Sequence, residues 1–262
     1  MLVAVDAGNT RIKFASVEAD RITARTELAS QPAPSVKRIV QTLADLTRGL
    51  GGDHAPEPRI AVCSVVPRLS DVLRSAISRY LPGAAITWIS AECDIGLALA
   101  LAQPHTLGAD RLANAVAAAD AFGSPVIAVG CGTATTLTVV NARLELVGGA
   151  IAPGPELQAR TLAEGTGLLP FVSLPATAWP TIDAIGDDTV KAIRSGVVYG
   201  AAGGIDRLIH QAREELEANA PVVLTGGYAP TLSPLIRLKH TVDADLTMKG
   251  IRIIADRDLR RP

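Results

Sequence analysis

The sequence has few aromatic residues and almost no net charge. Aromatic side chains make up only 3% of its 262 residues, too few for the stacking platforms that bind single-stranded nucleic acid. The net charge is −1, which gives no electrostatic attraction to nucleic acid or to an anionic membrane. We therefore expect neither as a partner.

Cysteine and long hydrophobic runs are scarce as well. Cys63, Cys93 and Cys131 are widely spaced, so they form neither a disulfide framework nor a zinc site, and we interpret them as buried thiols in a reducing cytoplasm. No apolar run approaches the roughly 20 residues that span a bilayer. The N-terminus is an apolar segment that contains Asp6, unlike a signal peptide. These features predict a cytoplasmic protein without a membrane anchor.

The first dozen residues contain the strongest functional signal. An apolar strand (2–5) is followed by Asp6, a bend at Gly8 and Asn9, and a second strand. A glycine at a bend lets backbone N–H groups approach an anion, and a neighbouring carboxylate can hold a metal ion. The pattern therefore predicts a site for phosphate and metal. Lys13 faces either the phosphates or solvent.

A second copy of this hairpin occurs half a chain later, at 127–140. Gly8 corresponds to Gly132 and Asn9 to Thr133, so the two bends are in the same register. Two unrelated hairpins are the alternative. We favour a duplicated domain with a nucleotide between the halves, since small-molecule sites often lie between domains.

Strand and helix patterns alternate along the chain and predict an α/β protein. Strands at 2–5, 11–17, 22–27 and 59–66 and helices at 36–50 and 68–80 give the order of one half of a duplicated kinase-type fold. The segment 91–107 is ambiguous between helix and loop. We expect a first domain at 1–115 and a second at 116–262.

Three further segments are candidates for ligand contact. Gly108–Arg111 lies where a loop enters a helix, a position that favours anions; Asp110 could accept a proton from a hydroxyl, and Arg111 could bind a carboxylate. Taken alone, this tetrapeptide is more often a capping aspartate beside a surface arginine. The runs 148–154 and 225–227 are rich in small residues and allow close backbone approach, although ordinary packing and turn formation explain them nearly as well.

Taken together, these segments resemble the type III pantothenate kinases, members of the superfamily of acetate and sugar kinases, heat-shock ATPases and actin. Residues 6–13 are similar to the first phosphate motif of that family, Pro104 with 107–111 to its substrate motif, and 132–136 to its second phosphate motif. The resemblance implies two duplicated actin-like (ribonuclease-H-like) domains, each a mixed five-stranded sheet flanked by helices.

The resemblance also implies a reaction: ATP-dependent phosphorylation of pantothenate to 4'-phosphopantothenate, the first step of coenzyme A biosynthesis. By position, Asp110 would be the general base, and Asp6 would hold Mg²⁺ directly or through water. ATP would be bound by Asp6, Ala7, Gly8, Asn9, Thr10, Arg11, Ile12, Lys13 and Thr133. Pantothenate would be bound by Leu101, Gly108, Ala109, Asp110, Arg111 and Thr189, the last from the partner subunit of a homodimer.

Two positions depart from the family pattern. Gly130 stands where the family usually has an aspartate that binds a monovalent cation, K⁺ or NH₄⁺, so that cation site is in doubt. Leu101 stands where the substrate pocket usually has a tyrosine. These departures keep two alternatives open. The chain could be a non-catalytic nucleotide-binding regulatory or accessory protein of the same fold, or a kinase for another small hydroxylated acceptor.

Overall fold

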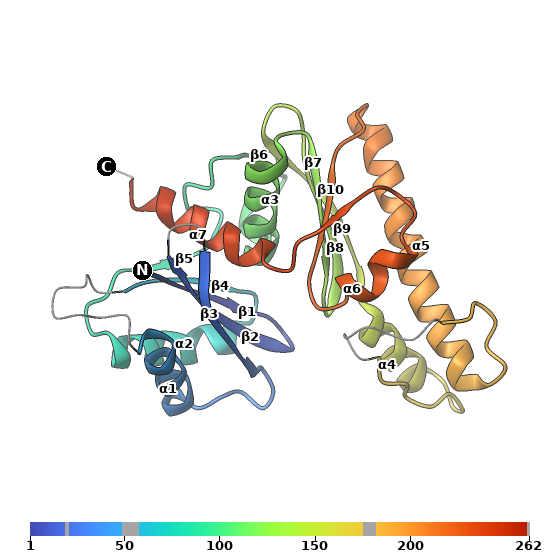
Figure 1. The fold of residues 1–262 in the computed structure, drawn as a ribbon, viewed down its shortest axis with the longest axis horizontal. Helices are drawn as coiled ribbons and strands as arrows, with labels where there is room; N and C mark the ends of the chain where they lie inside the picture. Colours follow the sequence, from blue (N-terminus) through green and yellow to red (C-terminus); the bar gives the residue numbers. More distant parts are fainter. Residues whose placement is uncertain (19–20, 49–57, 175–181, 261–262) are drawn as a thin grey trace. The chain divides into compact units, whose positions relative to one another are not determined.

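The computed structural model describes residues 1–18, 21–48, 58–174 and 182–260, drawn in Figure 1. The chain forms two compact units. Unit 1 comprises the described parts of Met1–Leu97, Ala102–Ala117 and Leu246–Pro262, and unit 2 comprises those of Ala98–Leu101 and Ala118–Asp245. The expected boundary between residues 115 and 116 lies close to one of these divisions, whereas the C-terminal helix packs with unit 1 although it follows unit 2 in the sequence.

Unit 1 contains a mixed five-stranded sheet in the order β3-β2-β1-β4-β5. The strands are β1 (Leu2–Ala7), β2 (Arg11–Glu18), β3 (Arg21–Ala29), β4 (Arg59–Ser64) and β5 (Ile86–Trp88). β1 pairs with β2 antiparallel and with β4 parallel. β1 and β4 read as nearly continuous apolar runs because helices cover both faces of the sheet at its centre.

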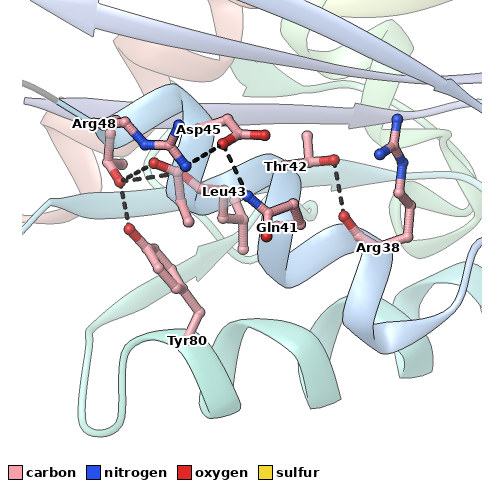
Figure 2. Close-up of polar contacts among 9 residues, drawn as sticks. Arg38, Gln41, Thr42, Leu43, Asp45, Arg48 and Tyr80 are labelled. Atoms are coloured by element: carbon pink, nitrogen blue, oxygen red, sulfur yellow. Dashed lines mark hydrogen bonds and ion pairs between the residues drawn. The ribbon is translucent and has the colours of Figure 1, made fainter.

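One face of this sheet is covered by helices α1 (Val36–Thr47) and α2 (Pro67–Tyr80). Alternate residues of β1, such as Val3 and Val5, are buried with Ile39, Leu43 and other apolar residues of the two helices. Figure 2 shows the polar contacts of α1, including the Oγ1–H of Thr42 that donates to the Arg38 carbonyl and the approach of Tyr80 from α2. These contacts belong to the packing of the two helices.

The opposite face of the sheet packs against α7 (Leu246–Asp258), which contacts β1 and β4. Arg59 of β4 forms an ion pair with Asp256 of α7, with 2.7 Å between the nitrogen and oxygen. Helix α3 (Ala109–Phe122) is joined to α7 by the Thr247 hydroxyl, which donates to Asn114 Oδ1 at 2.8 Å. This face carries Asp6, which alternates with Val5 along β1.

Unit 2 repeats the same topology. Its sheet has the order β11-β10-β7-β8-β9-β6, so β7, β8, β9, β10 and β11 take the places of β1 to β5. The strands are β6 (Ala98–Leu99), β7 (Val126–Cys131), β8 (Ala134–Val140), β9 (Glu145–Pro153), β10 (Val222–Thr225) and β11 (Thr241–Val242). The expected α/β class and the duplicated plan are confirmed. The sixth strand, β6, comes from the segment whose sequence was ambiguous and pairs with the outer edge of β9.

The helices of unit 2 are α4 (Pro155–Gly165), α5 (Thr189–Leu216) and the short α6 (Ala229–Leu232), accompanied by the 3₁₀ turn η2 (Ser233–Leu235); a second such turn, η1 (Pro104–Thr106), precedes α3. The long helix α5 begins at Thr189 and is capped by Asp188, whose carboxylate accepts the Lys191 N–H at 2.7 Å. Its buried residues, among them Val197 and Ile205, pack with Val129 of β7. None of the helices in the described ranges combines the length and hydropathy needed to cross a bilayer.

The register of the two hairpins agrees with the sequence only up to their bends. In the first hairpin Ala7 pairs with Ile12, so residues 8–11 form the bend. In the second, Cys131 pairs with Thr135, and the bend at 132–134 is shorter. Gly8 and Gly132 therefore occupy equivalent places, whereas the strands that follow them are offset. A repeat inferred from the bends alone does not reveal this difference in length.

Candidate active site

In the first bend, the Gly8 N–H is already hydrogen-bonded within the turn. Gly8 N–H donates to the Arg11 carbonyl at 3.0 Å, while Asn9 and Thr10 form the exposed tip. Gly8 thus shapes the bend, and the backbone of the tip is what a phosphate can approach. The expectation that this segment presents backbone to an anion applies to the tip rather than to the glycine itself.

Ser30 fixes the first bend from the end of β3. Its hydroxyl donates to the Gly8 carbonyl at 2.7 Å, and its N–H donates to the Thr10 carbonyl at 3.0 Å. Ser30 is only 4% exposed to solvent, so water competes little for these hydrogen bonds. The sequence motif gave no sign of Ser30, because the contact depends on how β3 pairs with β2.

A row of polar side chains crosses the sheet of unit 1 at Asp6. Strand pairing places Lys13 of β2 on one side of Asp6 and Cys63 of β4 on the other. Directly paired residues on neighbouring strands share a face of the sheet, so Lys13 lies beside Asp6. Arg11 does not belong to this row. It forms an ion pair with Glu27 of β3.

The electrostatics of Asp6 reflect this placement. Burial raises the pKa of Asp6 to about 6, the Lys13 ammonium opposes that shift, and the negative charge of Asp110 adds to it. Burial also raises the pKa of the Cys63 thiol well above its usual range, helped by Asp6 and then Asp110. Cys63 therefore presents an uncharged thiol near the two carboxylates. The negative charge of Asp110 therefore acts on both Asp6 and Cys63 within unit 1.

Asp110 lies in the first turn of α3, and Gly108 makes room for it. A Cβ at Gly108 would lie 2.6 Å from the Asp110 Oδ1 and 3.5 Å from a methyl of Val65. The same oxygen accepts the N–H of Arg111 at 2.9 Å. Burial raises the pKa of Asp110, while that N–H and the Arg111 guanidinium oppose the rise. A partly desolvated carboxylate of raised pKa is suited to accept a proton from a substrate hydroxyl.

Arg111 follows Asp110 into the helix and is partly buried. Burial lowers the pKa of its guanidinium, and the Asp110 carboxylate acts in the opposite direction. Removal from water strengthens the attraction between an arginine and an anion. Ala109, at the first position of α3, is buried. The segment 108–111 thus supplies an acceptor and a cation within one helical turn.

The other two residues assigned to the substrate lie in unit 2. Leu101 lies two residues beyond the end of β6 and is partly buried. Thr189, the first residue of α5, is exposed and lines a cavity of about 610 Å³ between α4 and α5 together with Gln158 and Thr161. Most of the remaining lining is apolar: Pro153, Leu162, Leu169, Ala192, Ile193, Gly196 and Val197.

The second bend is enclosed by backbone from two other turns of unit 2. Gly132 N–H donates to the Ala134 carbonyl at 3.1 Å, and Thr133 at the tip is exposed. Gly154 N–H donates to the Thr133 carbonyl at 3.0 Å, and a Cβ at Gly154 would lie only 2.1 Å from the Gly132 carbonyl oxygen. A Cβ at Gly226 would lie 2.5 Å from the carbonyl oxygen of Cys131, the residue before the bend. One glycine from each of the runs 148–154 and 225–227 therefore packs closely on this hairpin.

The row at the second bend carries no charge. Gly130 of β7 is paired with Thr136 of β8 and Thr225 of β10. In unit 1 the corresponding places are taken by Asp6, Lys13 and Cys63, respectively. Among the described residues there is no group of three or more histidine, cysteine, aspartate or glutamate side chains that could hold a metal ion. The residues around Gly130 do not fit a site for a monovalent cation that depends on a carboxylate.

Comparisons with known proteins show the family of the chain. Residues 2–211 match the family model described as type III pantothenate kinase. The chain belongs to the type III pantothenate kinase family. Type III pantothenate kinases of Rubrobacter xylanophilus and Gluconobacter oxydans are 38% and 35% identical to it, over 97% of both chains for the first and 100% of this chain and 95% of the relative for the second. The chain is accordingly an enzyme, a kinase that transfers phosphate to an alcohol.

Solved structures show the same fold at lower identity. A protein from Campylobacter jejuni assigned to the Baf family of transcriptional activators superposes with a TM-score of 0.58 and 17% identity, covering 97% of this chain and 98% of that one. The ethanolamine utilization protein EutJ from Carboxydothermus hydrogenoformans gives 0.53 and 16%, covering 96% and 89%. At this identity the likeness concerns the fold alone.

Proposed function

We propose that this kinase transfers the γ-phosphate of ATP to the terminal hydroxyl of pantothenate, forming 4'-phosphopantothenate and ADP in the cytoplasm. Two findings support the proposal: relatives named for this activity match the chain over nearly its whole length, and the negative charge of Asp110 acts on Asp6 within unit 1. The second supports the mechanism, because Asp6 belongs to the hairpin assigned to phosphate and Asp110 is the candidate proton acceptor.

Asp110 acts as the general base in this proposal. Its carboxylate accepts the proton of the hydroxyl as the hydroxyl oxygen attacks the γ-phosphorus, and the bond from phosphorus to the ADP oxygen breaks. The raised pKa of Asp110 supports this role, since a base whose pKa lies closer to the working pH retains a proton more readily once it has accepted one. Gly108 keeps the carboxylate accessible, because any side chain there would lie against it.

Pantothenate is held through its carboxylate by Arg111, beside Gly108 and Ala109, and the family resemblance assigns Leu101 to the same substrate. Thr189 contributes from the partner subunit of a homodimer. The exposure of Thr189 beside the apolar cavity between α4 and α5 supports this part of the proposal, since an exposed apolar surface of this kind is typical of a protein–protein contact. Leu101 offers no hydroxyl, so its contribution is apolar contact.

The phosphates of ATP are assigned to residues 6–13, and Thr133 is assigned to the same ligand by the family resemblance. Asp6 fits Mg²⁺, because this ion is commonly bound by one or two carboxylates and completes its shell with phosphate oxygens and water. When bound, Mg²⁺ neutralises charge on the phosphates. Lys13 adds a fixed cation beside Asp6. No step is assigned to K⁺ or NH₄⁺, because Gly130 and its neighbours supply no carboxylate.

The experiment is a substrate panel with the purified protein, ATP and Mg²⁺. Pantothenate, other small hydroxy acids and sugars are offered separately in K⁺, NH₄⁺ and Na⁺ buffers, and products are identified by mass spectrometry. We expect one phosphate added to pantothenate at similar rates in all three buffers. A phosphorylated product from another acceptor alone would identify a different substrate, and nucleotide binding without any product would indicate a regulatory protein.

A further inference from the structure

We propose that Tyr228 is a positioning residue for the second bend, and that its hydroxyl sets the affinity for ATP without taking part in the chemical step. The proposal deepens the function above, since it rests on the bend at 132–134 holding ATP phosphates. Tyr228 is buried, at 7% exposure, and no sequence motif pointed to its side chain.

The backbone of Tyr228 is bonded to the bend directly. Its N–H donates to the Cys131 carbonyl at 3.0 Å, at the residue that precedes Gly132. Gly226 makes this approach feasible: its φ is +95°, and a Cβ there would lie 2.5 Å from the same Cys131 oxygen. The turn that follows β10 therefore packs against Cys131, directly before the bend. The Tyr228 N–H thereby orients the Cys131 carbonyl.

The side chain of Tyr228 reaches in another direction, to α4. Its hydroxyl lies 3.0 Å from the Glu156 Oε2 and 2.9 Å from the Leu174 carbonyl oxygen. Both partners are acceptors for the hydroxyl hydrogen. Glu156 stands in the first turn of α4, directly after the segment in which Gly154 donates to the Thr133 carbonyl. Tyr228 and Gly154 thus connect the beginning of α4 to the two sides of the same bend.

This arrangement forms a closed circuit of hydrogen bonds around the bend. The circuit runs from the Cys131 carbonyl through Tyr228 to Glu156, and back through Gly154 to the Thr133 carbonyl. Loss of the hydroxyl opens the circuit at one bond while the aromatic ring still fills its place. The bend then loses part of its fixed geometry, and preorganised donors bind a phosphate more tightly than mobile ones.

The test compares Tyr228→Phe with the wild-type full-length chain, using a non-hydrolysable ATP analogue with Mg²⁺ in calorimetry and steady-state kinetics with pantothenate. We expect Kd for the analogue and KM for ATP to rise about five-fold, as for loss of one partly buried hydrogen bond. The value of kcat and the KM for pantothenate should stay within about two-fold. A general loss of structure would instead lower kcat and weaken the binding of both substrates together.

Tyr80→Phe is the matched control. Tyr80 also places its hydroxyl against another side chain, Thr47 Oγ1, but it belongs to the contact between α1 and α2 in unit 1 (Figure 2). We expect its Kd for the analogue to equal that of the wild type. Glu156→Ala serves as a second variant that removes an acceptor instead of the donor, and we expect a rise in KM for ATP in the same direction as for Tyr228→Phe.

The outcomes separate this inference from the proposed function. A wild-type chain that binds the analogue but leaves pantothenate unchanged would overturn the assigned substrate, and the five-fold loss of affinity in Tyr228→Phe would still support the role of Tyr228. Equal affinities of the wild type, Tyr228→Phe and Glu156→Ala would overturn the positioning role while the kinase activity stood. A wild-type chain that binds no analogue would overturn both.

Discussion

The two hairpins share a topology but differ in what they offer a nucleotide. In unit 1 the row across the sheet contains Asp6 and Lys13, with Cys63 beside them. In unit 2 the same row contains Gly130, Thr136 and Thr225. The first hairpin therefore supplies charged side chains, and the second supplies backbone with uncharged neighbours. Duplication has preserved the bends, while the ionic chemistry is concentrated in one copy.

The bends are also fixed by different means. A single buried hydroxyl, that of Ser30, holds the Gly8 carbonyl in the first. The second is enclosed by Gly154 and Gly226, where a Cβ would lie 2.1 Å from the Gly132 carbonyl oxygen and 2.5 Å from that of Cys131, respectively. We infer that the first site tolerates backbone change better than loss of its charges, and that the second has the opposite sensitivity.

The largest expected contrast is between Asp6→Asn and Thr133→Ala. Loss of the Asp6 charge should lower kcat/KM for ATP at least about a hundredfold, as is common when an electrostatic partner of the transition state is removed. Thr133→Ala keeps the backbone of the second bend and should cost about five-fold, close to the loss of one hydrogen bond. Steady-state kinetics at saturating pantothenate measures both. Equal losses would remove the distinction between the two hairpins.

The Asp6→Asn variant also sharpens the comparison through stability. A pKa of about 6 in the folded chain instead of 3.8 means that the folded state binds the proton more tightly, so ionised Asp6 destabilises it. The penalty is absent below about pH 4, develops as the pH rises through 6, and reaches up to about 3 kcal/mol. Without Mg²⁺ or nucleotide, Asp6→Asn should therefore be more stable than the wild type at pH 7.5 and equal to it at pH 4. Urea unfolding at the two pH values measures this, and a difference independent of pH would contradict it.

The same titration governs activity. Protonated Asp6 holds a cation poorly, and the pKa of Asp110 is raised as well. The value of kcat/KM should therefore fall as the pH drops through about 6, earlier than for carboxylates of ordinary pKa. A pH–rate profile recorded from pH 5 to 8 tests this expectation. Activity that is unchanged down to pH 5 would show that neither carboxylate titrates in this range.

Gly154→Ala probes the backbone enclosure of the second bend. Its Cβ would lie 2.1 Å from the Gly132 carbonyl oxygen, so the bend must shift, at a cost of about 1–3 kcal/mol in stability. ATP affinity should fall with it. Gly165→Ala is the control, because a Cβ there meets no atom within 4 Å. Thermal unfolding and analogue binding measure the pair, and identical behaviour of both variants would remove the proposed close contact.

The smallest expected effect is that of Ser30→Ala. Alanine cannot make the hydrogen bond that the Ser30 hydroxyl donates to the Gly8 carbonyl, so the first bend loses about 1 kcal/mol of stabilisation. The KM for ATP should therefore rise a few-fold. Ser75→Ala removes a hydroxyl that donates to a helix carbonyl, that of Asp71, at an exposed position. This control should behave as the wild type. A KM for ATP equal in the two variants would mean that Ser30 does not position the bend.

The sequence predicted the features that are local. The hairpins, the entry of α3 at Asp110 and the duplicated plan follow from strand periodicity, glycine placement and polar residues at bends, all of which lie close together in the chain. Family resemblance supplied the reaction and the assigned residues. Asp6 and Asp110 are far apart in sequence, and the effect of the Asp110 charge on Asp6 and Cys63 depends on the tertiary structure of unit 1.

What the sequence did not reveal depends on long-range contacts. Ser30 acts on Gly8 through strand pairing, and Tyr228 acts on Cys131 through a turn from another part of unit 2. Strand β6 is too short for a periodic pattern and exists because it pairs with β9. The ion pair of Arg11 with Glu27 likewise requires the register of β2 and β3. Each of these contacts is set by tertiary packing rather than by local propensity.

The central claim is that Asp110 removes the proton of the accepting hydroxyl. A single turnover with ATP labelled in its γ-phosphate, followed by separation of ATP, phosphate and phosphopantothenate, tests it most directly. We predict that the wild type moves the label to pantothenate, and that Asp110→Asn binds the ATP analogue normally but transfers label at least about a hundredfold more slowly. Transfer by Asp110→Asn at the wild-type rate would contradict the account.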